Sequence, residues 1–270
     1  MRRKGLMTAV LLAVVIAATA SAHDLFLKLD SYFLQPNSKA IVRVLNGTFQ
    51  KSDGAVARER LADLSLHGPG PMASSAEPIV WRAEDKTSIM EIPTGGSGTH
   101  LVGISTKPRE IALKAADFNN YLEEDGLPDI LAAREKNNEL GKDVRERYSK
   151  HVRAVFQVGD KLSDDYKRSL NYPVEIIPQQ NPYSLKVGQT IAVLCLLDGQ
   201  PLVNQFVIAG WESKDGKLHL FNSRTRAKGI ARFKLTSAGR WFVKMIHMES
   251  SSEQGINYES KWATLTFEIR

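Results

Sequence analysis

The spacing of apolar residues along most of the chain follows the two-residue period of β-strands. From His23 to Asp30 the side chains alternate, which places Leu25, Leu27 and Leu29 on one face of an extended segment together with His23. Similar short segments recur between turns rich in Gly, Pro, Asn and Asp. We predict further strands over residues 40–45, 62–66, 79–83, 88–92, 99–105, 110–114, 174–177, 190–197, 205–212, 218–222, 229–235, 240–248 and 261–269.

The period changes between residues 117 and 157. Residues 117–122 indicate a helix that stops at Gly126, and Pro128 suits the first turn of a second helix. Farther on, apolar residues recur close to the helical period with Arg and Lys between them: Val144, Tyr148, Val152 and Val155. We therefore predict an amphipathic α-helical insert over 117–157, with its charged residues forming a solvated face.

Two pairs of similar segments occur in the same order in the two β-rich halves. Residues 32–42 parallel residues 183–193, and residues 97–102 parallel residues 238–243. This repetition predicts a mainly β protein of two Ig-like or prealbumin-like β-sandwich domains. The expected domains are 23–116 and 158–270, with the helical insert 117–157 between them.

The first 22 residues have the pattern of a cleaved secretory signal peptide. Three basic residues precede an apolar run over 6–18, and Ala20-Ser21-Ala22 is a small-x-small cleavage site. The apolar run is shorter than the roughly 20 residues that cross a bilayer. The mature chain is expected to begin at His23, to be periplasmic and to carry no membrane span.

Charge and cysteine content argue against a nucleic-acid-binding protein and a disulfide-stabilised fold. Loss of the signal peptide lowers the 36 Lys and Arg to 33 against 30 Asp and Glu, so the net charge falls from +6 to +3. No dense basic stripe with interleaved aromatics remains, and no nucleic-acid partner is expected. Cys195 is the single cysteine and lies in an apolar run, which excludes an intrachain disulfide and favours simple burial.

Cleavage before His23 would place an α-amino group and an imidazole on the same residue. The amine, with an ordinary pKa near 8, and Nδ1 can chelate one metal ion. Nitrogen ligands of this kind suit copper, nickel or cobalt. We therefore predict that His23 binds a transition metal ion.

Further ligands must come from elsewhere in the chain. The candidates are His247, which follows Met245 and precedes Met248, His100, which opens the corresponding strand of the first half, and Glu259. Imidazole with thioether would suit Cu⁺, and a carboxylate could ligate the metal or orient a ligand. For each of the three, a packing role in the sandwich is the alternative.

Signatures of catalysis are missing from the sequence: it contains no GxSxG, P-loop or dinucleotide-binding GxGxxG motif. The chain is therefore not expected to be an enzyme. A non-catalytic module for peptide or carbohydrate is the alternative, and it would need exposed aromatics such as Trp211, Trp241 or Trp262 along a groove. A third possibility, a histidine-brace copper oxidase of polysaccharide, would need an exposed flat face around His23.

The mature chain resembles an exported bacterial family of unassigned biochemistry that is often labelled a nickel-uptake, substrate-specific domain. The resemblance covers nearly all of the mature chain and rests on residues 22–27, 118–127, 147–150, 181–188 and 258–267. It implies a periplasmic β-sandwich protein linked to nickel or cobalt uptake. With no membrane span of its own, such a protein would bind or deliver the metal, with a membrane transporter component as its possible partner.

Overall fold

A computed structural model describes residues 23–69 and 79–270. The predicted signal peptide, residues 1–22, lies outside the described residues. None of the helices in the described ranges is long and apolar enough to cross a membrane.

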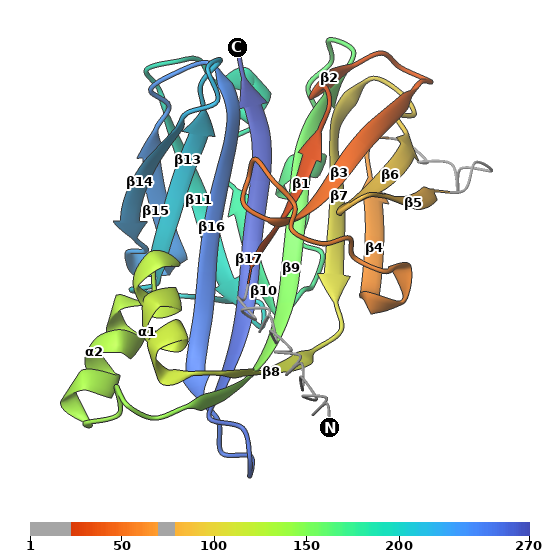
Figure 1. Cartoon of the computed structure of the whole chain (residues 1–270). Coiled ribbons are helices and arrows are strands. Elements are labelled where there is room, and N and C mark those ends of the chain that lie inside the picture. The colour runs from red at the N-terminus through yellow and green to blue at the C-terminus, as the bar shows by residue number, and fades with distance from the viewer. Residues whose placement is uncertain (1–22, 70–78) are drawn as a thin grey trace, which may run out of the picture.

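One nine-stranded sheet runs through the whole molecule (Figure 1). Its continuous path is β14 (Leu218–Arg224), β13 (Phe206–Glu212), β16 (Gly239–Ser250), β17 (Tyr258–Ile269), β9 (Val144–Val158), β7 (Gly98–Thr106) and β4 (Leu61–His67). The short strands β2 (Phe33–Leu34) and β8 (Arg109–Leu113) also pair with β9. β17 and β9 pair in parallel, from Tyr258 with Glu146 to Thr266 with Ala154.

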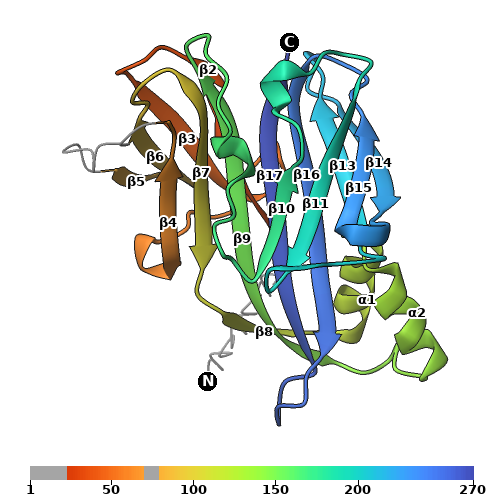
Figure 2. The same cartoon turned by 180° about the vertical axis from the view of Figure 1, so that it is seen from behind.

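Two smaller sheets pack on opposite faces of the large one, as the two opposed views show (Figure 2). The first contains β1 (Asp24–Leu29), β3 (Lys39–Gly47), β6 (Thr87–Pro93) and β5 (Val80–Glu84). The second contains β10 (Val174–Pro178), β11 (Thr190–Leu197), β12 (Gln200–Pro201) and β15 (Ile230–Lys234). Successive side chains of β9 point to opposite faces of the large sheet, so β9 contributes to the core on each side. Val152 and Phe156 pack against the first small sheet, and Val155 packs against the second.

The mainly β prediction is confirmed, and each predicted strand overlaps an observed one. Cys195 is fully buried in the second core, as expected. The two halves share one sheet, so the predicted boundaries at 116 and 158 do not mark a break between separate sandwiches.

The prediction of helix over residues 144–157 is wrong, because this segment is β9. Only the first part of the expected insert is helical, as α1 (Ala115–Glu124) and α2 (Pro128–Lys136). Pro128 opens α2 as predicted. α1 buries Phe118, Tyr121 and Leu122 in a third cluster with residues of β16 and β17.

Candidate functional site

His23 lies immediately before β1, whose first residue, Asp24, pairs with Gly47 of β3. The imidazole is one-third exposed, and its Nε2 lies 3.2 Å from Oδ2 of Asp53. Asp53 is positioned by the turn that follows β3, where its backbone N–H donates to the carbonyl of Asn46 at 2.9 Å. The sequence therefore brings an acidic residue to His23 through a turn 30 residues downstream.

This contact bears on which imidazole nitrogen is available to a metal. An ionised carboxylate only accepts hydrogen bonds, so the short distance to Asp53 favours the tautomer with its proton on Nε2. In that tautomer Nδ1 carries the lone pair, on the side of the ring nearer its own backbone. A carboxylate that holds the distal N–H of a histidine is the usual support for a metal-bound imidazole. Sequence reasoning missed Asp53 because local spacing does not show contacts made across a turn.

The backbone of His23 is held by a buried lysine. Lys150 of β9 donates from Nζ to the carbonyl of His23 and, at 3.0 Å, to Oδ1 of Asn46. Burial lowers the pKa of Lys150 to about 8. The helical interpretation of this segment assigned Lys150 to a solvated face, so its burial was not predicted.

Asp24, the residue after His23, is also held by a buried lysine. Nζ of Lys244, on β16, lies 2.6 Å from the carboxylate of Asp24 and 2.7 Å from that of Asp125, just after α1. All three side chains are largely shielded from solvent. The start of the predicted mature chain is thus anchored to β9, β16 and the end of α1.

His100 lies far from this region. Nε2 of His100 donates to the carbonyl of Gly96 at 2.8 Å, and the ring stacks on Phe156 in the interior. Burial lowers its pKa, so the ring is neutral at pH 7. His100 pairs with Phe156 whereas His23 contacts Lys150, and six residues of β9 separate them by about 20 Å at roughly 3.3 Å per residue.

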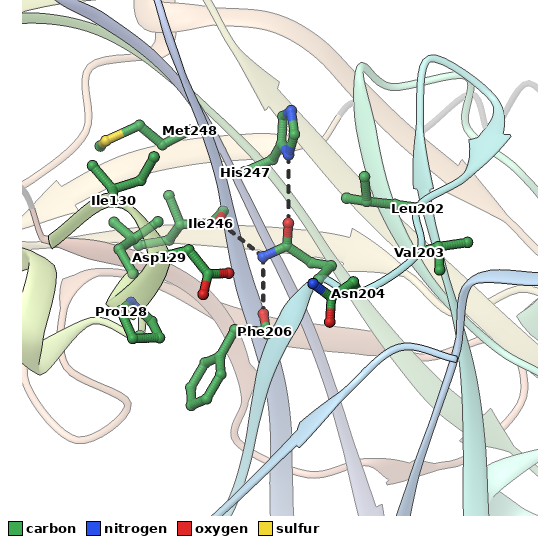
Figure 3. A pocket seen from close by; sticks show the side chains of 13 residues that line it. Pro128, Asp129, Ile130, Leu202, Val203, Asn204, Phe206, Ile246, His247 and Met248 are labelled. Atoms are coloured by element: carbon green, nitrogen blue, oxygen red, sulfur yellow. Dashed lines mark hydrogen bonds between the residues drawn. The ribbon is translucent and has the colours of Figure 1, made fainter. Parts of the chain in front are cut away.

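His247 lines a pocket of about 240 Å³ between the start of α2 and strands β13 and β16 (Figure 3). Gln205 donates from Nε2 to the carbonyls of Phe206 and Ile246, which turns its Oε1 toward Nδ1 of His247 at 3.4 Å. Burial lowers the pKa of His247, and its buried Nε2 has no hydrogen-bond partner in the described chain. Met248 lies on the opposite face of the strand, in the cluster beneath α1, and Met245, on the face of His247, is buried in the second core.

Glu259 is occupied by an ion pair. Its Oε1 lies 3.4 Å from Nη1 of Arg147, which also binds Glu253, while Nη2 of the same guanidinium binds Glu110 at 3.0 Å. The structure thus brings none of His23, His100, His247 and Glu259 into contact with another. No group of three or more His, Cys, Asp or Glu in residues 23–69 and 79–270 could hold a metal ion.

The described residues also bear on the two other functional alternatives. Trp241 and Trp262 are buried, with 0% and 1% exposure, and therefore do not line an open groove. Trp211 is half-buried and stacks on His219 with ring centroids 4.3 Å apart. A histidine brace needs a second histidine beside the first, and the side chain beside the His23 ring is the carboxylate of Asp53.

A family model described as "Domain of unknown function (DUF4198)" matches residues 20–249. No curated protein matches the chain. Among the solved structures, the D0-D1 domain of Intimin is 11% identical, with 89% of this chain and 96% of that chain covered and a TM-score of 0.20. Dimeric latent PorU from Porphyromonas gingivalis is 9% identical with a TM-score of 0.21, and the match covers 92% of this chain but only 20% of that one.

Proposed function

We propose a metal-binding function for this chain, which belongs to the DUF4198 family, a family whose description assigns it no activity. In the proposal, the protein is exported to the periplasm, begins at His23 and holds copper, nickel or cobalt between the α-amine and Nδ1 of that residue. The observation that carries the proposal is the contact of 3.2 Å between Nε2 of His23 and Asp53, which favours Nδ1 as the metal-binding nitrogen.

The chemistry follows from donors on a single residue. The amine nitrogen, Cα, Cβ, Cγ and Nδ1 close a six-membered ring with the metal, and Cu²⁺ or Ni²⁺ displaces the proton of an amine whose ordinary pKa is near 8. Lys150 holds the carbonyl of the same residue, so the backbone that carries the amine is already ordered.

The site would be open. Since the described residues supply no cluster of three side-chain ligands, the remaining coordination positions would be filled by water or by a second molecule. An open two-donor site suits a protein that takes up a metal and passes it on, with a membrane transporter component as a candidate recipient. No covalent chemistry is proposed.

Metal titration of two purified forms tests this proposal. One form begins at His23, and the other carries one extra residue before it, which converts the amine to an amide. Calorimetry with Cu²⁺ and Ni²⁺, supported by copper EPR, is expected to show one-to-one binding by nitrogen ligands in the first form only. Equal or negligible binding in both forms would refute the proposal.

Two variants of the native-start form test the ligand set. Asp53→Asn should weaken metal binding roughly ten- to a hundredfold, as expected when the group that orients a metal-bound imidazole is lost. His247→Gln is the matched control and should bind as the unmodified form does, because His247 lies in a separate pocket.

A further inference from the structure

A second site with different chemistry adjoins the start of the predicted mature chain. It is a pocket of about 150 Å³. It is lined by Leu25, Asn46, Ala55, Val56, Ala57, Arg60, Thr106, Arg109, Tyr148 and Lys150. Three of these described lining residues are cationic and none is acidic.

Lys150, the deepest of the three, is a buried cation that contacts only neutral groups. The residue is 5% exposed, and its ammonium is bonded to the carbonyl of His23 and the amide oxygen of Asn46. The rings of Tyr148 and Trp262 lie under it, each with its centroid 5.5 Å from Nζ. Within the described chain Lys150 has no direct ion pair, and the carboxylate of Asp24 is bonded to Lys244 instead. Burying a cation without a counter-ion is costly, so this arrangement favours an anion from outside.

The two arginines have unused donors. Arg60 ends the short 3₁₀ turn Arg58–Arg60, and one of its N–H groups donates to the carbonyl of Lys107 at 3.0 Å. Arg109, the first residue of β8, is exposed, and its side chain makes no hydrogen bond or ion pair within the ranges that the structure describes. The two guanidinium groups repel each other with no carboxylate in the lining to offset the repulsion. An anion between them would relieve it.

Neutral donors complete the lining. Thr106 accepts the backbone N–H of Lys150 on its hydroxyl oxygen at 2.9 Å, so its own hydrogen is left to donate. Asn46 uses its oxygen to accept from Lys150, so its NH₂ group is left to donate. The pocket therefore presents charged and neutral N–H and O–H donors together, which is the combination that binds oxyanions.

We propose that this pocket binds a small oxyanion, a carboxylate or a phosphate or sulfate, with Lys150 at its floor and the guanidinium forks of Arg60 and Arg109 around it. A pocket of about 150 Å³ has room for an inorganic oxyanion or a short dicarboxylate. This site goes beyond the metal-binding function and does not depend on it.

Calorimetric titration of the metal-free mature chain with phosphate, sulfate and malonate tests the proposal. Binding of at least one anion is expected, and the tightest of the three identifies the ligand class. Arg109→Gln should weaken that binding roughly ten- to a hundredfold through loss of a charge-assisted hydrogen bond. Arg58→Gln is the matched control, because it removes the same charge from an exposed residue of the neighbouring turn that does not line the pocket.

Lys150→Met provides the buried counterpart of this test and should abolish binding, because it removes the charge at the floor of the pocket. If that variant does not fold, the comparison of Arg109→Gln with Arg58→Gln still decides. Absence of binding for all three anions, or equal losses in the Arg109 and Arg58 variants, would overturn the proposal.

The metal-binding proposal and the anion-binding proposal can be tested separately. His23→Ala keeps the backbone carbonyl that Lys150 binds, so it should lose the metal and retain the anion. Arg109→Gln should lose the anion and retain the metal.

Discussion

Glu146 is buried beneath α1, on the same face of β9 as Lys150. Tyr121 donates to its Oε1 at 3.3 Å and Ser260 donates to the same oxygen, while the buried Oε2 has no partner in the described chain. Burial raises the pKa of Glu146 to about 7, against the opposing influence of these hydrogen bonds and of the Lys150 charge. Near neutral pH the carboxyl group is therefore close to half-protonated.

The raised pKa of Glu146 predicts how stability depends on pH. Between about pH 4.5 and 7 the folded state retains a proton that the unfolded state has lost, so the free energy of unfolding should fall as the pH rises, by up to about 3 kcal/mol. Glu146→Gln cannot titrate and should lose this decline. Urea unfolding of both forms at pH 5 and pH 8 measures the change in the free energy of unfolding. The change in the unmodified protein minus the change in the variant isolates the contribution of Glu146. It removes that of His151, whose buried ring has a pKa lowered to about 4 and acts in the opposite direction. A pH-independent difference would contradict the prediction.

Gly68→Ala tests how tightly His100 is enclosed. A Cβ at Gly68 would lie 2.2 Å from Nδ1 of His100, and that ring is held by Gly96 and stacked on Phe156. The ring cannot move aside without breaking these contacts, so the substitution should lower the free energy of unfolding by about 1–3 kcal/mol. Thermal unfolding measures the loss. Gly54→Ala, where a Cβ meets nothing within 4 Å, is the control and should be nearly neutral.

Residue type was enough to nominate His23, but not to identify the groups around it. Asp53 reaches His23 through a turn, and Lys150 reaches it from the middle of the large sheet. Both contacts depend on pairing between distant segments. His247 and Glu259 were also proposed from residue type. The local sequence could not show their neighbours, which are the amide of Gln205 for His247 and Arg147 for Glu259.

Among the elements, β9 shows why a strand can have the sequence pattern of a helix. It lies inside the large sheet and is covered on both faces, so polar and apolar residues do not alternate along it in the usual way. Glu146 and Lys150 are buried on one face, while His151 and Arg153 are buried on the other. The spacing of the remaining apolar residues then matches the 3.6-residue period by coincidence. β1 and β11 are also buried along most of their length, but the alternation of the first and the apolar run of the second were enough to predict them correctly.

Lys244 of β16 forms ion pairs with Asp24 of β1 and with Asp125 at the end of α1, so its removal should loosen β1 and α1. Lys244→Met leaves the carboxylates of Asp24 and Asp125 buried without their cation, which should cost about 3–5 kcal/mol. Hydrogen exchange should quicken most in β1 and α1. Lys234→Met, an exposed lysine on β15, is the control and should change neither stability nor exchange. Uniformly faster exchange across the molecule would contradict a local effect of the Lys244 ion pairs on β1 and α1.

At the scale of the whole molecule, the shared sheet couples the two cores. β17 contributes Leu265 to the second core, while its neighbour β9 contributes Val152 and Phe156 to the first. The similar segments of the two halves correctly suggested β-rich structure on each side. They could not show that β9 and β17 pair in parallel, since that pairing joins residues more than a hundred positions apart.

Thermal unfolding should therefore show one transition rather than two. Leu265→Ala should lower the free energy of unfolding by about 2–5 kcal/mol, the usual loss for a leucine deleted from a core. Hydrogen-exchange protection should fall by the same free energy in β4 and β7, which lie on the other side of β9. Two calorimetric transitions, or a loss of protection confined to β10–β17, would contradict this coupling.

The first and last strands of the chain meet in the middle of the molecule. Thr264 of β17 donates its hydroxyl to the carbonyl of Leu25 in β1 at 2.8 Å, across a sequence separation of 239 residues. A ribosome releases β1 long before β16 and β17 have been made, so Phe26, whose ring packs edge-on against Phe242 of β16, lacks that partner during most of synthesis. The nascent chain therefore exposes this side of β1 to a chaperone until the C-terminal strands have been made.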